Sequence, residues 1–267
     1  MIPRALTIAG SDSGGGAGIQ ADLKTFTVFG VFGMSAVTAL TAQNTCGVTG
    51  VYPLPATFVR RQIDAVMSDI GADAVKTGML VDAEIIAVVA EAVRQYRIEL
   101  LVVDPVMAAQ SGTSLLEEAA QSVLVKELIP LSALITPNIH EAQALTGVVV
   151  NSVADMHRAA RALIELGARA SLVKGGHLVG ADAVDVFDDG KEQHEFTAAR
   201  LPVTHTHGTG CLLSAAITAH LACGAGVRAA IERAKRFVSV AIRHGLAIGH
   251  GTGPANALAW LEERGRG

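Results

Sequence analysis

The sequence predicts an α/β protein with a doubly wound, mostly parallel central sheet that carries helices on both faces. Short apolar runs of strand type alternate with longer segments of helical periodicity along the chain. The residues are 50% hydrophobic but only 4% aromatic, and this aliphatic composition suits strands that are buried on both faces. No linker, repeat or low-complexity stretch divides the sequence, so we expect residues 1–267 to form a single domain.

The first half of the chain follows this alternation in order. The expected strands cover residues 5–9, 34–40, 48–54, 74–77 and 100–106. The expected helices cover residues 19–29, 56–70, 82–96 and 117–128. Each strand is a short run rich in aliphatic residues, and each helix repeats its apolar residues every three or four positions.

The second half continues the pattern and adds an antiparallel hairpin. Its expected strands cover residues 133–136, 170–175, 183–187 and 191–196. Its expected helices are a short one around Glu141 and longer ones over residues 152–166, 210–223, 227–247 and 255–263. Ser152 is a suitable N-cap, and Asp189-Gly190 is typical of a hairpin turn between the last two strands.

Charge and composition exclude several classes of partner. The 21 basic and 25 acidic residues give a net charge of -4 without a polybasic block, so no nucleic-acid partner is expected. No apolar stretch approaches the ~18 residues of a membrane span, and the N-terminal apolar run is too short for a signal peptide. We therefore expect a cytoplasmic protein without membrane contact. The three cysteines should be reduced, with Cys46, Cys223 and Trp260 in the core.

Ligands of open α/β sheets bind beyond the carboxyl ends of the strands, and the first expected strand ends there in a glycine-rich loop. In GSDSGGGAGIQAD, residues 10–22, the spacing G-x-G-x-x-A fits a dinucleotide-binding fingerprint. That fingerprint needs an acidic residue about 20 positions further on, and none lies between Asp22 and Asp64, so we reject it. The Walker-type loop G-x-x-x-x-G-K-[ST] does not occur in the sequence either. A turn that only packs a helix against the sheet is the alternative.

Three further strand ends carry charged or amide side chains. Asp104 ends an apolar strand, where a carboxylate can reach a phosphate-bound magnesium ion through water, although an aspartate before Pro105 is also typical of a turn. Asn138 and Glu141 lie three residues apart at a helix start, so Asn138 can cap the helix while Glu141 faces the crevice. Lys174 ends another strand, although a lone lysine is more often solvated.

The segment THTHGTGC, residues 204–211, is the sharpest signal in the sequence. Gly208, Thr209 and Gly210 open an apolar helix, whose free backbone N–H groups and positive dipole end can bind an anion. The same field favours the thiolate of Cys211, and the alternative for this cysteine is a small buried side chain. The two histidines of the segment have no third metal ligand at a convincing spacing, so zinc is not expected.

Seven motifs occur in one order from end to end of the chain: AGSDSGGGAGIQADLKTF, ALTAQNT, KTGML, VVDPVM, ITPN with Glu141, VKGGH and HTHGTGCLLSAAI. Together they resemble the hydroxymethylpyrimidine and hydroxymethylpyrimidine-phosphate kinases of thiamine biosynthesis, a family of the ribokinase-like superfamily. The resemblance implies a ribokinase-like fold, ATP and Mg²⁺ as cofactors, and a homodimer. It also implies phosphorylation of a hydroxymethyl group on a small pyrimidine and then of the resulting phosphate.

The resemblance further implies roles for individual residues. It places the pyrimidine against Gly10, Asp22, Gln43, Met79 and Val106, and the reacting oxygen near Cys211. It assigns the nucleotide to Lys174, Asn138 and Glu141, and the metal to Asp104 and Glu141. The catalytic backbone that holds the transferring phosphoryl group is then Gly208, Thr209, Gly210 and Cys211. An aminopyrimidine edge offers both donors and acceptors, so Asp22 and Gln43 are expected to orient the ring.

Departures from the family pattern and two alternative functions stay open at this point. A serine is usual where Gly14 stands, a threonine where Leu212 stands, and histidines where Thr252 and Ala257 stand, but none of these changes removes a proposed catalytic group. A pyridoxal or pyridoxine kinase would act on a similar flat ring with a hydroxymethyl group. A non-catalytic pyrimidine sensor would keep the fold without turnover, which the intact catalytic motifs disfavour. A sugar kinase is disfavoured because such relatives carry an aspartate where Cys211 stands.

Overall fold

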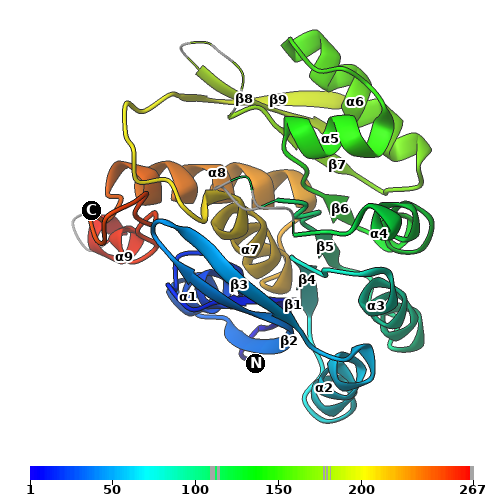
Figure 1. Cartoon of the computed structure of the whole chain (residues 1–267). Helices are drawn as coiled ribbons and strands as arrows, with labels where there is room; N and C mark the ends of the chain where they lie inside the picture. The colour runs from blue at the N-terminus through cyan, green and yellow to red at the C-terminus, as the bar shows by residue number, and fades with distance from the viewer. Residues whose placement is uncertain (109–111, 113–114, 177, 179, 181, 265–267) are drawn as a thin grey trace.

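Across the residues that the structure describes, the chain forms a nine-stranded sheet in the order β3-β2-β1-β4-β5-β6-β7-β8-β9 (Figure 1). This computed structural model describes residues 1–264 except 109–111, 113, 114, 177, 179 and 181. The strands are β1 (Arg4–Asp12), β2 (Phe32–Asn44), β3 (Gly47–Pro53), β4 (Ala74–Thr77), β5 (Leu101–Val103), β6 (Leu134–Ile135), β7 (Ser171–Lys174), β8 (Asp182–Asp188) and β9 (Gln193–Ala199). The strands from β2 to β7 in this order run parallel, and β3 at one end and β8 and β9 at the other pair antiparallel. The mostly parallel sheet and the hairpin are confirmed.

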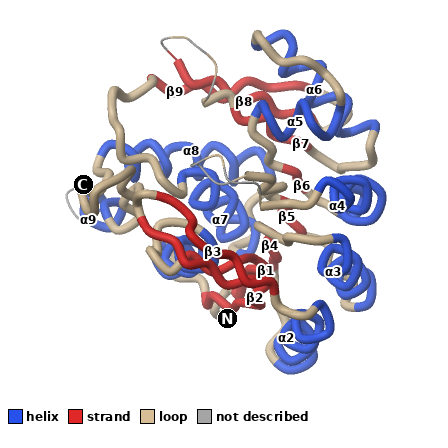
Figure 2. The backbone as a smooth tube through the Cα atoms, in the orientation of Figure 1, coloured by secondary structure: helices blue, strands red, loops and turns tan. Residues whose placement is uncertain are grey.

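Helices cover both faces of the sheet, as expected. They are α1 (Gly18–Val28), α2 (Ala56–Asp69), α3 (Ala83–Gln95), α4 (Glu118–Val123), α5 (Ile139–Thr146), α6 (Val153–Glu165), α7 (Thr209–Ala222), α8 (Val227–Arg243) and α9 (Ala259–Arg264). After α4 the chain continues through a π-helical turn and a 3₁₀ turn, Leu124–Leu128 and Ile129–Leu131. Figure 2 shows α1, α7, α8 and α9 on one face of the sheet and α2 to α6 on the other. Within the described residues, no helix is both long and apolar enough to cross a membrane.

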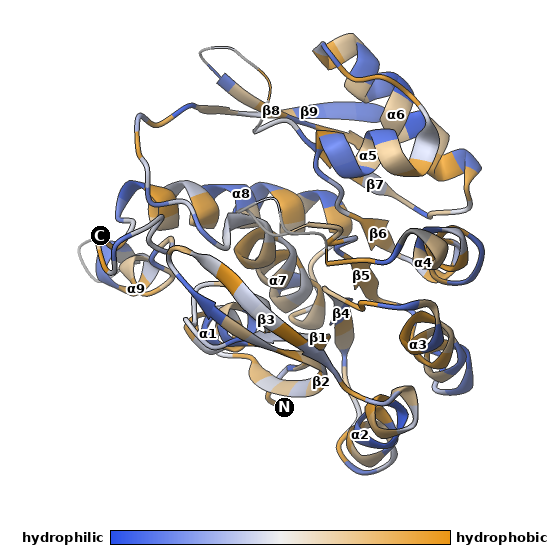
Figure 3. Cartoon of the chain, viewed as in Figure 1, coloured by the Kyte–Doolittle hydropathy of each residue, from blue (hydrophilic) through white to orange (hydrophobic). Residues whose placement is uncertain are grey.

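The pleat of the parallel strands sends alternate side chains to opposite faces and so builds two apolar cores. Val75 and Val103 belong to the core beneath α2, α3 and α6. Their chain neighbours Ala74 and Val102 belong to the core beneath α7 and α8. In Figure 3 the helices carry both hydrophobic and hydrophilic residues. This is expected of helices that pack one side against a sheet and expose the other to solvent.

The ends of two helices and the burial of two cysteines differ from the sequence-based expectation. Helix α8 ends at Arg243 rather than at residue 247, because the Leu246 N–H donates to the Pro254 carbonyl instead of continuing the helix. Helix α9 begins at Ala259 rather than at residue 255, because the backbone N–H groups before it have tertiary partners. Cys46 and Cys223 are exposed, since one lies in the β2–β3 turn and the other at the end of α7.

Candidate active site

A cavity of about 1150 Å³ lies beyond the carboxyl ends of the parallel strands, and residues of the loop from β9 and of the start of α7 line it. It is the place that the strand order predicts for a ligand. The cavity brings together all but one of the residues that the sequence singled out. Those that line it are Gly10, Gln43, Met79, Asp104, Val106, Asn138, Glu141, Lys174, Gly208, Thr209, Gly210 and Cys211.

The backbone at the start of α7 has the form of an anion-binding site. Gly208 is the N-cap in a left-handed conformation with φ of 80°, and a side chain there would collide with the Gly16 carbonyl oxygen. In the described part of the chain no side chain caps this helix, so the first-turn N–H groups of Gly210 and Cys211 stay open towards the cavity. Donors of this kind bind phosphate at helix starts.

Lys174 and Asp104 face each other beside this backbone. Lys174 Nζ donates to Asp104 Oδ1 at 2.9 Å, and Ser214 Oγ donates to Asp104 Oδ2 at 2.9 Å. A Cβ atom placed on Gly210 would lie 3.5 Å from Lys174 Nζ, so the ammonium stands next to the anion-binding backbone. Burial alone would lower the pKa of Lys174, but the carboxylates of Asp104 and Glu141 outweigh it and raise that pKa. The lysine is therefore a charged group of the cavity, not a solvated surface residue.

Asn138 and Glu141 form a reciprocal cap on α5. Asn138 Oδ1 accepts from the Glu141 N–H at 3.0 Å, and Glu141 Oε2 accepts from the Asn138 N–H at 2.7 Å. The expected cap is confirmed, and Glu141 still lines the cavity. Burial raises the pKa of Glu141 to about 7, with the Lys174 ammonium acting against this rise and the Asp104 carboxylate adding to it. A bound cation would favour the ionised form of this carboxyl.

Cys211 occupies the third position of α7, but its thiol is not activated as the sequence suggested. Burial raises the pKa of the Cys211 thiol to about 11, although the Lys76 ammonium and the Gly18 backbone N–H oppose this rise. The expectation that the helix field alone favours the thiolate is wrong for this structure, because desolvation of the anion is the larger effect.

Asp22 is the expected site residue that does not line the cavity. Its carboxylate is fully buried, accepts from Lys76 Nζ at 2.8 Å through both oxygens, and accepts from the Thr7 hydroxyl at 2.6 Å. Lys76 lies at the cavity wall in its place. A direct contact between Asp22 and a ring therefore stays a prediction. The sequence analysis missed Lys76, although a lysine inside the four-residue strand AVKT was a visible signal.

A second missed group joins the glycine-rich loop after β1 to the anion-binding backbone. Asp12 is buried and accepts from the N–H groups of Gly14, Gly16 and Ala17 at 2.8 to 3.0 Å. His207 Nε2 lies 3.0 Å from Asp12 Oδ2. The first glycine loop is therefore a closed structural turn around a carboxylate, which agrees with rejecting it as a dinucleotide site.

The two histidines of the 204–211 segment do not share a metal site. His205 Nδ1 accepts from the Gly253 N–H at 3.1 Å, whereas His207 bonds to Asp12. Within the residues described, no group of three His, Cys, Asp or Glu side chains could hold a metal ion by itself. A metal here would need oxygen ligands from a bound phosphate as well as from protein.

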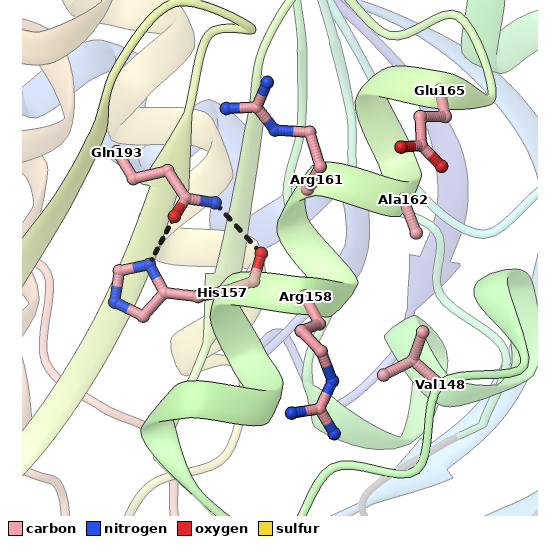
Figure 4. A pocket seen from close by; sticks show the side chains of 7 residues that line it. All are labelled: Val148, His157, Arg158, Arg161, Ala162, Glu165 and Gln193. Atoms are coloured by element: carbon pink, nitrogen blue, oxygen red, sulfur yellow. Dashed lines mark hydrogen bonds between the residues drawn. The ribbon is translucent and has the colours of Figure 1, made fainter.

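A second hollow, of about 480 Å³, lies along the outer side of α6 (Figure 4). Several of its polar side chains are bonded to one another or to residues beside the hollow. His157 bonds to Gln193 at 2.9 Å and to Glu195 at 2.8 Å, and Arg161 donates to Asp188 at 2.8 Å. None of the residues that line the larger cavity borders this hollow.

Comparison with known proteins decides the family. A model described as phosphomethylpyrimidine kinase matches residues 12–256. The chain belongs to the phosphomethylpyrimidine kinase family. A hydroxymethylpyrimidine/phosphomethylpyrimidine kinase of Bacillus subtilis is 49% identical over 260 residues, which cover 97% of this chain and 96% of that protein. The thiamine biosynthesis bifunctional protein ThiED of Geobacter sulfurreducens is 52% identical over 258 residues, and the match spans 97% of this chain but only 53% of that longer protein.

Solved structures of this family and of a related one share the fold. The ADP complex of Bacillus subtilis pyridoxal kinase superposes with a TM-score of 0.91 at 39% identity and covers 97% of this chain and 98% of that one. A phosphomethylpyrimidine kinase of Clostridium difficile superposes with a TM-score of 0.80 at 45% identity, covering 90% of this chain and 98% of that one. The family resemblance and the ribokinase-like fold predicted from the sequence are confirmed.

Proposed function

We propose that this kinase transfers the terminal phosphoryl group of ATP to the hydroxymethyl group of hydroxymethylpyrimidine and then to the resulting monophosphate. The observation that carries the proposal is one cavity in which the open backbone of Gly210 and Cys211, the Lys174 ammonium and the Asp104 carboxylate converge. Phosphoryl transfer needs positioned donors and positive charge around the moving group more than covalent chemistry. Family membership supports the same reaction.

The phosphate end of the cavity has groups for both charge and orientation. The backbone N–H groups at the start of α7 would hold the transferring phosphoryl group, with Lys174 beside them. Asp104 and Glu141 offer carboxylate oxygens, and a bound cation would favour the ionised form of Glu141 against the burial that raises its pKa. These residues fit Mg²⁺, which binds few protein carboxylates and keeps water and phosphate oxygens as its other ligands. When bound, Mg²⁺ would neutralise charge on the phosphates.

At the ring end, the hydrogen bonds around Gln43 determine which amide group is available to bind the ring. Thr41 Oγ1 lies 2.9 Å from the Ser11 carbonyl oxygen and 3.2 Å from Gln43 Oε1, so we assign its one proton to Ser11. When His207 Nε2 carries a proton and donates it to Asp12, it has no lone pair for an N–H of the Gln43 amide, which lies 3.3 Å away. We therefore assign the reverse amide orientation, in which the amide oxygen faces His207 and the nitrogen donates to Thr41. The second amide N–H is left for a ring nitrogen.

Apolar groups complete the ring site. Met79 and Val106 line the same wall, and a Cβ on Gly10 would press against the Met79 side chain. A flat ring could lie against these side chains while the Gln43 amide holds its edge. We further propose that residues 1–267 act as one domain, in the cytoplasm, and as a homodimer. The exposed side chains of Leu40, Val51 and Tyr52 along β2 and β3 support the homodimer.

The assay that tests the proposal supplies ATP and magnesium with hydroxymethylpyrimidine, its monophosphate or pyridoxal, and identifies products by mass spectrometry. We expect the monophosphate and diphosphate of the pyrimidine, with no transfer when EDTA removes the metal. The likeness to pyridoxal kinase is the reason for the third substrate. Phosphorylation of pyridoxal alone would replace the proposal, and absence of ADP with every substrate would favour a non-catalytic sensor.

A further inference from the structure

Lys76 is a buried ammonium at the wall of the larger cavity. It lies in the central strand β4 and its side chain has no exposed surface, yet it borders the cavity. Burial alone would lower its pKa, but the Asp22 carboxylate at 2.8 Å outweighs burial and keeps that pKa above its usual value. Burial raises the pKa of Asp22, and the Lys76 ammonium and the Thr7 hydroxyl act against that rise. Because Nζ lies 2.8 Å from both carboxylate oxygens, we treat the pair as an ammonium and a carboxylate. A buried ion pair seldom adds stability over apolar side chains of the same size, so the placement calls for another explanation.

The position of Lys76 relative to Cys211 explains why the ion pair is placed there. Helix α7, which carries Cys211, packs on β4, and both side chains border the same cavity. The charges that act on the thiol come from every element around it: Lys76 on β4, Asp22 on α1, Asp104 after β5 and Lys174 on β7. Among these charges, Lys76 is the one that most favours the thiolate of Cys211, whereas Lys174 lies with Asp104 beside the phosphate end.

The proton inventory of Lys76 agrees with this assignment. An ammonium has three N–H donors, and the Asp22 oxygens take two of them. Among the described residues, Lys76 Nζ forms no other hydrogen bond, so its third N–H is left on the cavity side of the pair.

We infer that Lys76 is a positioning residue for the first phosphorylation, and that its ammonium, held in place by Asp22, partly offsets the burial of Cys211 and so stabilises the small thiolate fraction that takes the hydroxyl proton. The inference rests on the proposed function. In that step the hydroxymethyl O–H bond breaks, an O–P bond forms and the terminal P–O bond of ATP breaks. The proton moves to the Cys211 sulfur and leaves to solvent with the product, and ADP carries the electron pair of the broken P–O bond. The second step starts from a phosphate anion and needs no thiolate.

The first test measures the ionisation of Cys211 without any turnover. Cys46 and Cys223 are exposed, so both are first changed to serine, which leaves Cys211 as the cysteine that iodoacetamide can label. The pH midpoint of alkylation is then followed by mass spectrometry in this background and after Lys76→Met. We expect the midpoint to rise by about one unit or more, because a close opposite charge typically shifts a pKa by ~1–3 units.

Two further variants keep this test decisive. Asp22→Asn combined with Lys76→Met removes both charges and leaves no unpaired buried ion, so it should fold if Lys76→Met alone does not. It should also raise the midpoint, because the lysine acts on the thiol more strongly than the aspartate. Lys235→Met is the matched control, since Lys235 is paired with Asp185 at 2.6 Å on the same cavity wall and is not among the groups that shift the Cys211 pKa most. Equal midpoints in all four proteins would overturn the inference.

The second test separates a thiolate role from a purely structural one. Rates are measured once from hydroxymethylpyrimidine and once from its monophosphate, for the parent and for the folded Lys76 variant. We expect the first rate to fall about 10- to 100-fold and the second to stay within about threefold, since only the first step uses a base. Equal losses in both rates would make the Lys76–Asp22 pair structural. If the parent acts on neither pyrimidine, the proposed function fails, and the alkylation midpoints still decide the Lys76–Cys211 coupling.

Discussion

Two lysine–aspartate pairs lie at the carboxyl ends of the parallel strands, and they differ in how far each is sealed. Lys76 and Asp22 are both fully buried, with Nζ 2.8 Å from each carboxylate oxygen. Lys174 and Asp104 meet through one oxygen at 2.9 Å, and the lysine side chain is 15% exposed to the cavity. Both oxygens of Asp22 contact one ammonium, and one of them also accepts from Thr7, whereas Asp104 uses one oxygen for Lys174 and the other for Ser214.

The difference shows how one type of ion pair can have two uses. A sealed pair cannot exchange partners, so it keeps a charge in a fixed place next to a reacting group. An open pair can exchange, because an incoming phosphate can take the lysine while the aspartate turns to a metal ion. The sealed pair should therefore matter for folding and for the thiol, and the open pair for both transfers of a phosphoryl group.

We expect the largest effects from removing the ammonium of each pair in turn. Lys174→Met should lower kcat for both phosphorylations about 10³-fold, because it removes charge stabilisation at the moving phosphoryl group. Lys76→Met should instead lower the free energy of unfolding by about 3–5 kcal/mol, because it leaves a buried carboxylate uncompensated. Guanidinium unfolding and product-resolved kinetics measure the two effects. Equal losses of stability in both variants would mean that the two pairs do not differ in kind.

Cys211 lies within the field of both lysines, and its substitution sharpens the distinction between the two steps. Cys211→Ala should lower the first phosphorylation about 10²-fold, at the lower end of what a general base contributes, because burial keeps most of the thiol protonated. The second phosphorylation should change less than about threefold, since the backbone donors of α7 remain. Each rate is measured from its own starting substrate. An equal loss in both steps would make Cys211 a structural part of the anion-binding backbone, and no loss in either would leave it a packing residue.

A third pair of substitutions tests whether the two ends of the cavity act separately. Gln43→Ala should raise the KM for hydroxymethylpyrimidine about tenfold, because one or two hydrogen bonds to the ring edge are lost. Glu141→Ala should leave that KM close to the parent value and raise the magnesium and ATP concentrations needed for half-maximal rate. Steady-state kinetics with each component varied in turn gives both numbers. Identical defects in the two variants would contradict the division of roles.

Much of the fold could be predicted because strand and helix periodicities differ and the chain alternates between them. Ligands of open α/β sheets bind beyond the carboxyl ends of the strands, and this rule predicted that Asp104, Glu141, Lys174 and the start of α7 lie together although they are far apart in sequence. The ends of α8 and α9 could not be predicted in this way. Their last and first N–H groups bind to tertiary partners that periodicity does not show.

The electrostatics of the site were the least predictable part. Asp22 precedes Lys76 by 54 residues, and their pairing depends on how α1 packs over β1 and β4. The local sequence around Cys211 indicated a helix start, which favours a thiolate, but it did not indicate the depth of burial, which opposes one. Which effect is larger depends on desolvation by the whole fold rather than on the motif.

His220 provides the smallest test, because it is a half-buried ionisable group without the partner that both lysines have. Its ring packs 4.5 Å from the Phe29 ring, and within the described residues its Nε2 has no hydrogen-bond partner. Burial lowers the pKa of His220 to about 4, and the positive charges of Arg233 and Arg236 add to this effect. Because the folded-state pKa lies below the ordinary value, the folded protein binds fewer protons than the unfolded chain between about pH 6.5 and 4. Stability from this group is therefore present above pH 6.5 and is lost as the pH falls.

Between pH 7.5 and 5.5 this loss should amount to about 1 kcal/mol of unfolding free energy. His220→Phe removes the titrating group while keeping an aromatic ring against Phe29, and His220→Gln keeps a polar group that cannot become charged in this range. Urea unfolding of the parent and both variants at pH 7.5, 6.5 and 5.5 measures the effect, and the parent should lose about 1 kcal/mol more than either variant. Parallel pH dependence in all three proteins would show that His220 does not carry the acid sensitivity. Buried charge in this fold would then be tolerated at His220 without a counter-ion, unlike at Lys76 and Lys174.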